Sequence, residues 1–130
     1  MPAASSYDYA VIRVVPRVER EEFVNVGVIL SCPARDFLGA TVELDERRLL
    51  ALDPAVDLDV VRDNLEAIPK LCAGGPSLGP IGRLPQRERF HWLVAPRSTV
   101  IQTSAVHTGC CEDPERELRH LVEALVRLGG

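Results

Sequence analysis

Polar residues with the potential for chemistry gather in two segments, and the first begins in the N-terminal quarter of the sequence. It contains Arg13, Arg17, Glu21, Glu22 and Asn25. A carboxylate at Glu21 or Glu22 could hold Arg13, either as a structural ion pair or as one wall of a polar pocket. Asn25 interrupts an apolar run and needs hydrogen-bond partners if it is buried, so it could instead tie down a neighbouring loop. Arg13, Arg17 and Asn25 are therefore candidate binding residues, and Glu22 is a candidate catalytic carboxylate.

The second segment, residues 97–109, brings an arginine, an amide, hydroxyls and an imidazole together before a predicted helix. Its candidate binding residues are Arg97, Gln102 and Ser104, and its candidate catalytic residue is His107. Anions bind readily at such a place, because arginine offers a planar fork and helix amides point outward. His107 has the chemistry of a general acid or base. The alternative interpretation is a polar turn that only caps the last helix.

Other chemistries find little support in the spacing. His107, Cys110 and Cys111 offer three ligands, whereas structural zinc takes four, usually from two separated pairs. A triad of Ser104, His107 and Asp113 lacks the strand–turn–helix elbow that would expose the nucleophile. Neither GxxxxGK[ST] nor GxGxxG occurs, so the glycine-rich stretch is not a recognised phosphate cradle. We expect no metal site and no cofactor.

Composition restricts the class of protein. The chain has 130 residues and 46% hydrophobic residues, which fits one domain with one core. A net charge of −4 makes nucleic-acid binding unlikely, because that binding depends on neutralising phosphates. The four cysteines lack the paired spacing of a disulfide framework. No apolar run approaches the roughly 18 residues of a membrane span, and the N-terminus lacks signal-peptide features, so we expect no membrane association and a cytoplasmic location.

Periodicity predicts the elements that position these residues. Strands are expected at residues 7–15, 23–32, 37–44, 90–95 and 99–103. Helices are expected at residues 46–52 and 114–128, and from residue 58 to an end at Pro69 and Gly74-Gly75, with Asp45, Asp57 and Asp113 as caps and Gly129-Gly130 as the end of the last one. Residues 1–6 are expected to be a flexible N-terminus, and residues 73–89 an internal Gly/Pro-rich loop, either a linker or a lid.

These elements predict an α+β fold. We expect an antiparallel or mixed sheet of about five strands, with two to three helices packed mainly on one face. Short links between the first three strands favour antiparallel hairpins, and the apolar strand at residues 23–32 should be central beside residues 7–15. Gly27 within it can admit the close approach of another backbone. The whole chain, residues 1–130, should form a single domain.

Two stretches resemble the signatures of a bacterial family, the domain-of-unknown-function 3037 family (DUF3037). The first stretch is YDYAVIRVVP from Tyr7 followed by REEFVNVGVIL from Arg20, and the second is SAVHTG from Ser104 followed by Asp113-Pro114. Ala105 departs from the pattern, where proline is expected. The resemblance runs from about Tyr7 to Leu128 and implies no particular reaction. It implies an accessory role, because members of the family are often encoded beside HipA-like kinases.

The main hypothesis is a binding or accessory module that presents a polar groove between the two segments, with a HipA-like kinase as a possible protein partner. The alternative is a small enzyme acting on a phosphate-containing or nucleotide substrate, in which Arg97 binds the anion and His107 transfers a proton. A third interpretation is a purely structural subunit. Whether Arg13, Glu22, Asn25, Arg97 and His107 converge in one pocket separates a compact site from a dispersed one.

Overall fold

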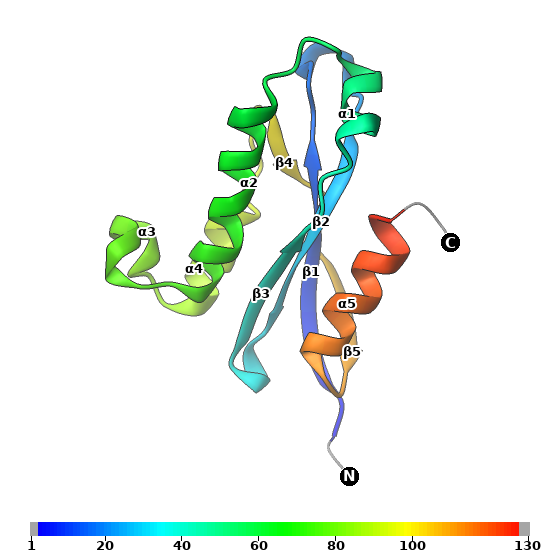
Figure 1. Ribbon diagram of the computed structural model, residues 1–130. Coiled ribbons are helices and arrows are strands. Elements are labelled where there is room, and N and C mark those ends of the chain that lie inside the picture. The colour runs from blue at the N-terminus through cyan, green and yellow to red at the C-terminus, as the bar shows by residue number, and fades with distance from the viewer. Residues whose placement is uncertain (1–2, 128–130) are drawn as a thin grey trace.

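The computed structural model describes residues 3–127, and within that range it contains five strands and five α-helices (Figure 1). The strands are β1 Ser5–Val14, β2 Val24–Cys32, β3 Phe37–Val42, β4 Ile101–Thr103 and β5 His107–Cys111. The helices are α1 Glu46–Leu52, α2 Leu58–Ala73, α3 Gly79–Gly82, α4 Gln86–Leu93 and α5 Pro114–Leu125. The predicted helix end at residues 128–130 lies outside the described residues, as do residues 1–2 of the expected flexible N-terminus.

The strands form one antiparallel sheet in the order β3-β2-β1, with the next position shared by β4 and β5. Both of these short strands pair with β1, β5 along its first half and β4 along its last three residues. The predicted central position of residues 23–32, antiparallel to residues 7–15, is confirmed. Ser5 and Ser6, expected in the flexible N-terminus, belong to β1 because β5 pairs with them.

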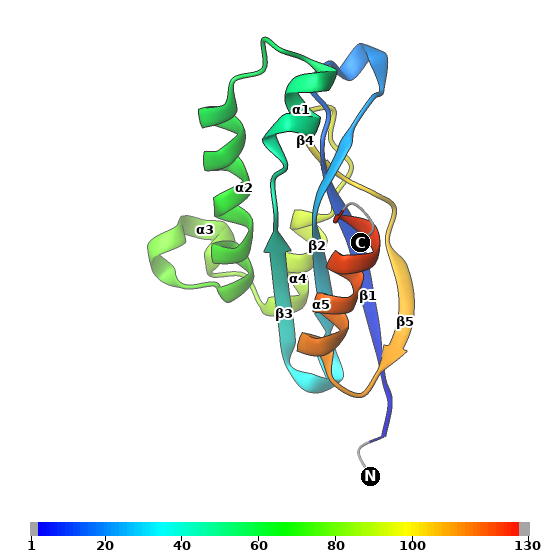
Figure 2. The same ribbon diagram turned by 45° about the vertical axis from the view of Figure 1, so that its right-hand side comes forward.

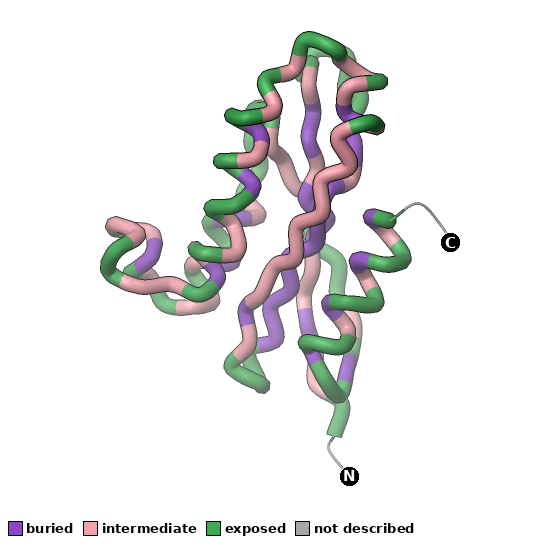
Figure 3. The backbone as a smooth tube through the Cα atoms, viewed as in Figure 1, coloured by how far each residue is buried: buried purple, intermediate pink, exposed green. Residues whose placement is uncertain are grey.

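Helices cover both faces of the sheet (Figure 2). One core cluster joins β1 and β2 to α1, α2 and α4, and its central residues include Ile12, Ile29, Leu49, Leu65 and Phe90. The other core cluster joins the opposite face to α5 through residues that include Tyr7, Val28, Leu30, Leu118 and Val122. Buried positions run along β1 and β2, whereas buried and exposed positions alternate along α2 and α5 (Figure 3). The expectation of helices mainly on one face holds for α1, α2 and α4, but the expected two to three helices were too few.

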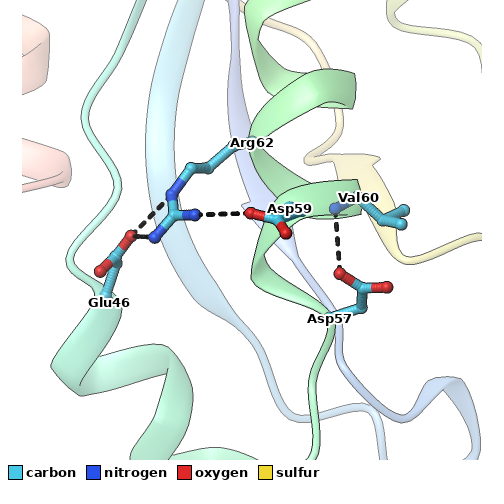
Figure 4. A network of polar contacts seen from close by, with 5 residues as sticks. All are labelled: Glu46, Asp57, Asp59, Val60 and Arg62. Carbon is cyan, nitrogen blue, oxygen red and sulfur yellow. Dashed lines mark hydrogen bonds and ion pairs between the residues drawn. The ribbon is translucent and has the colours of Figure 1, made fainter.

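Aspartate caps start three of these helices, as the sequence predicted. The carboxylates of Asp45, Asp57 and Asp113 accept hydrogen bonds from backbone amides in the first turns of α1, α2 and α5. Arg62 then ties α2 to α1, since its guanidinium donates to Glu46 as well as to Asp59 (Figure 4). Of the breaks predicted to end the second helix, Gly74 is its C-cap, whereas Pro69 lies inside α2, which continues to Ala73 and buries Cys72 in the core. No helix among residues 3–127 has the length and apolar character to cross a membrane.

Regular structure replaces the loop expected at residues 73–89. Its glycines and prolines delimit short helical segments instead of preventing them: a 3-10 turn at Pro76–Leu78, then α3, then the start of α4. The segment is closed where the Gly75 amide donates to the Gly82 carbonyl at 2.9 Å. The Arg89 guanidinium fixes its base by donating to the carbonyls of Leu84 and Cys72.

The strand expected at residues 90–95 is also wrong, because residues 90–93 complete α4. Phe90 and Leu93, three residues apart, are buried together, while His91 and Trp92 between them are exposed. That spacing belongs to a helix rather than to a strand. The strand expected at residues 99–103 is shorter than predicted, since β4 holds only Ile101–Thr103.

Candidate functional site

Three of the predicted binding residues form a row across the sheet. Asn25 of β2 lies opposite Arg13 of β1, and Arg13 lies opposite Gln102 of β4. Directly paired residues share one face of a sheet, here the face on which α5 packs. We call Asn25, Arg13 and Gln102 the polar row. Since α5 packs on β2 and β3, β5 lies at the sheet edge beside the helix rather than beneath it (Figure 2).

Asn25 has a defined structural role within the polar row. Its Nδ2 donates to the backbone carbonyl of Leu125 at 3.1 Å and so satisfies one of the free carbonyls at the end of α5. The amide must present its nitrogen to that carbonyl, which fixes Oδ1 on the other side. Oδ1 is buried and accepts no hydrogen bond within residues 3–127. The predicted role of tying down a neighbouring segment is thus present, and one acceptor remains unused.

Arg13 is a half-buried cation without an anion. Its guanidinium carbon lies 4.0 Å from the centre of the Phe23 ring, which is a cation–π contact. In the described part of the chain, no carboxylate lies within 4.0 Å of it and its buried Nε donates no hydrogen bond. Burial accordingly lowers the pKa of Arg13 below its ordinary value. The ion pair considered with Glu21 or Glu22 does not form: neither carboxylate lies within 4.0 Å of Arg13, and Glu22 pairs with Arg20 at the surface.

His107 lies in β5, not in the turn that the sequence suggested. It pairs with Tyr9, and the ring centres of His107 and Tyr9 lie 5.4 Å apart. The ring centres of Tyr9 and Tyr7 lie 6.0 Å apart, so the three rings form one group. Burial, with Glu117 nearby, raises the pKa of Tyr7 to about 12, so this phenol stays neutral. Tyr9 precedes Arg13 by four residues, which separates the two by about 13 Å along the strand. The aromatic group and the polar row therefore form an extended surface and not a compact pocket.

The remaining predicted site residues lie elsewhere. Arg97 stacks 4.3 Å from the Trp92 ring, beside α2, on the sheet face opposite to His107. Arg17 is exposed and lies 3.7 Å from Asp53. Ser104 has a backbone role, since its Oγ accepts from the amide of Val11 where the chain passes from β4 to β5. Arg13, Glu22, Asn25, Arg97 and His107 thus do not converge in one pocket but divide between two faces of the sheet and the surface.

Sequence reasoning missed a polar network on the α4 face. Arg87 of α4 pairs with Asp8 of β1 and donates to the buried hydroxyl of Ser31 at 2.8 Å. Thr108 of β5 donates to the other oxygen of Asp8 at 2.8 Å. The alternation of β1 places Asp8 on this face, but its partner Arg87 lay in the segment interpreted as a loop. The network fastens α4 to the first and last strands of the sheet.

We expect the Asp8 network to make stability depend on acid pH. Burial alone would raise the pKa of Asp8, but hydrogen bonds from Arg87 and Thr108 outweigh it and hold the pKa below 3.8. The stabilisation is therefore complete above the unfolded pKa and is lost as pH falls through the folded one. Because Arg87 is 40% exposed, Asp8→Asn should cost only about 1 kcal/mol at pH 7.

Urea unfolding from pH 7 down to pH 2.5 or so measures this effect, with the exposed Asp63→Asn as the matched control. The gap between Asp8→Asn and the wild type should narrow in acid, and Asp63→Asn should show no such gap. A gap that stays constant with pH would show that the charge of Asp8 contributes nothing.

Thiols and acids do not assemble into a metal site in the described part of the chain. Within residues 3–127, no three His, Cys, Asp or Glu side chains are grouped closely enough to hold an ion. All four cysteines are free of disulfides: Cys32, Cys72 and Cys111 are buried, and Cys110 is exposed. Burial raises the pKa of Cys72 to about 12 and also raises the pKa of Cys111. Thiols of this kind pack as small apolar groups.

Fold and surface together define a small α+β protein whose sheet carries a polar row beside a single helix on one face and a helical layer on the other. The chain belongs to the family described as "Protein of unknown function (DUF3037)", whose model matches residues 9–126. This confirms the resemblance seen in the two sequence stretches. No curated protein and no solved structure matched the chain.

Proposed function

We propose that this protein is a cytoplasmic binding or accessory module that engages a protein partner through the α5 face of its sheet. The observation that carries the proposal is the unpaired Arg13, half-buried on Phe23 in the middle of the polar row. A desolvated cation is costly until an anion pairs with it. A partner carboxylate over Arg13 would supply that anion.

The neighbouring side chains have the character of an interface. Phe23 is 44% exposed although it is large and aromatic, and His107 is exposed beside the half-buried Tyr9. Aromatic residues and arginine are enriched at the energetically dominant positions of protein interfaces. The surface spans about 13 Å from Tyr9 to Arg13, which suits an extended contact better than one small substrate. A HipA-like kinase is the partner that the family resemblance suggests.

The geometry favours this function over the enzymatic alternative. A phosphate held by Arg97 and a proton transferred by His107 require both groups at one substrate. The two residues lie on opposite faces of the sheet. Within the part of the chain that the structure describes, the imidazole of His107 lies beside the ring of Tyr9 and not beside a carboxylate that could orient it. The Arg97 side chain instead belongs to a separate groove.

Arg13→Gln is expected to weaken binding of the purified HipA-like kinase at least about tenfold, because the charge-assisted contact is lost. Isothermal titration calorimetry measures the affinity, and thermal unfolding checks that the variant is folded. Arg17→Gln is the matched control, since Arg17 is an exposed arginine outside the polar row that lies 3.7 Å from Asp53, and this variant should bind as the wild type does.

Equal affinity of Arg13→Gln and the wild type would contradict the proposal. A second contradicting result would be a wild-type protein that does not bind the kinase but turns over a member of a panel of nucleotides and phosphoesters. In that case His107→Gln would abolish the turnover. That second result would establish the enzymatic alternative.

A further inference from the structure

A second surface lies on the side of the sheet opposite to the polar row, and it contains three large apolar side chains that are exposed to solvent. Val60 of α2, Trp92 of α4 and Val100 before β4 are 52%, 40% and 38% exposed. All three line one groove of about 450 Å³ between α2, the end of α4 and β4. Its volume is within the range of about 300–1,000 Å³ that is usual for ligand sites. Exposed apolar residues grouped in this way mark interaction sites more often than scattered ones do.

Helix α2 lines this groove with side chains that lie beside its core stripe. Its core stripe consists of Val61, Leu65 and Cys72. A second stripe, made of Val60, Asn64, Ala67 and Leu71, follows the same helical spacing and lines the groove. Val60 points away from the ion pair that Arg62 makes with Glu46 on the other flank of α2 (Figure 4). Leu71 at one end of this stripe also packs against the core, but Val60 at the other end is 52% exposed on a flank that would normally be polar.

Arg97 gives the groove a charge. It is the one charged residue among those that line the groove, and its guanidinium is stacked on Trp92. It also donates to the Trp92 carbonyl, which orients it at the rim. Within residues 3–127, no carboxylate lies within 4.0 Å of Arg97. The lining of the groove therefore carries one positive charge, whereas the whole chain carries a charge of −4.

We propose that this groove docks an acidic amphipathic segment of a partner protein. The segment's apolar side chains would cover Val60, Trp92 and Val100, and an Asp or Glu beside them would pair with Arg97. Two helices bound the groove, which is the setting in which an amphipathic helix inserts its apolar face. The positive charge of Arg97 favours an acidic segment over a basic one. This preference is opposite to that of the whole protein, which is acidic and attracts cations. This surface is separate from the polar row and does not depend on the function proposed for it.

Trp92 reports directly on the groove, because it is the only tryptophan in the chain. Two synthetic helical peptides serve as probes. Both carry leucine at i, i+4 and i+7 and contain no tryptophan, and they differ in having glutamate or lysine beside the leucines. Titration of the full chain with the glutamate peptide should shift Trp92 emission to shorter wavelength, with an affinity at least about tenfold above that of the lysine peptide.

Three variants locate the contact. Arg97→Gln should abolish the preference for glutamate, while Val60→Gln should weaken both peptides. Val106→Gln is the matched control, because Val106 is also an exposed valine (44%, against 52% for Val60) and lies next to β5, outside the groove, so this variant should bind both peptides normally. Thermal unfolding confirms that each variant is folded.

Three results would overturn the proposal. The first is a lysine peptide that binds as well as the glutamate peptide, and the second is unchanged Trp92 emission with both. The third is a wild-type dimer in light scattering that Val60→Gln, but not Val106→Gln, converts to a monomer, since the occupant would then be a second copy of this chain. The response to Arg13→Gln distinguishes this surface from the polar row: that variant should leave peptide affinity unchanged.

Discussion

Replacing Phe90 with alanine is expected to lower the free energy of unfolding by about 3–5 kcal/mol, the usual cost of removing a fully buried phenylalanine. Phe90 is 1% exposed and belongs to the cluster that joins α4 to the sheet and to α2. Its ring also lies 5.0 Å from the guanidinium carbon of Arg87, so the cavity would disturb the Asp8 network as well. Urea unfolding followed by circular dichroism measures the loss.

Trp92→Ala is the matched control for Phe90→Ala, because both residues are aromatic and belong to the same helix. Trp92 is 40% exposed, and its replacement should cost about 1 kcal/mol or less. In a strand, residues 90 and 92 would face the same side and the two losses would be similar. Similar losses would therefore contradict the helical assignment of this segment.

Replacing Gly27 with alanine is expected to destabilise the fold by about 3 kcal/mol, at the upper end of the usual cost of overpacking. A Cβ at Gly27 would lie 2.5 Å from the carbonyl oxygen of Thr41 and 3.2 Å from the Cα of Val42, both backbone atoms of β3. Gly27 follows the register shift between β1 and β2, where the strands are already distorted. β3 can retreat only by opening its ladder with β2, so the clash cannot be relieved cheaply.

Gly39→Ala tests whether backbone contact is the cause. A Cβ at Gly39 would lie 2.8 Å from the ring of Phe37, a half-buried side chain that can move aside. We expect a cost of about 1 kcal/mol or less. The midpoints of thermal unfolding of the two variants give the comparison, and equal midpoints would show that the Thr41 carbonyl is not the obstacle.

The two surfaces have different relations to folding. Two of the three residues of the polar row lie on β1 and β2, the most buried strands, and Asn25 also holds the end of α5. Changes in the polar row therefore need a stability measurement beside every binding measurement. In the groove, Val60, Trp92 and Arg97 are exposed, so these three can be exchanged with little effect on the fold, whereas Leu93 belongs to the core. A loss of binding in one of these three variants can be assigned to contact when its thermal unfolding matches that of the wild type.

Local interactions account for what the sequence alone determined. Asp45, Asp57 and Asp113 each cap the helix that follows them, because an aspartate and the amides of the next turn need only a few neighbouring residues. The first three strands and their antiparallel order follow from alternation and short links. Gly27 admits another backbone, as its place in an apolar run suggested, and the family followed from two short stretches.

Tertiary structure decided the elements whose local signals conflict. The apolar run at residues 90–95 fits a strand or a helix equally well, and packing of Phe90 and Leu93 on the core selects the helix. β5 has no distinct pattern of its own and forms because β1 offers it a free edge. The glycines and prolines at residues 73–89 predict breaks, but contacts from Arg89 decide that short helices lie between them.

The arrangement of the candidate sites also depended on contacts between distant residues. Arg13, Asn25 and Gln102 form one row because the register of three strands brings them together, and no local rule sets that register. Arg97 and His107 are ten residues apart in sequence, yet the passage of the chain from α4 through β4 to β5 places them on opposite faces. The residue types indicated binding chemistry, but only the strand pairing and helix packing separated it into two surfaces.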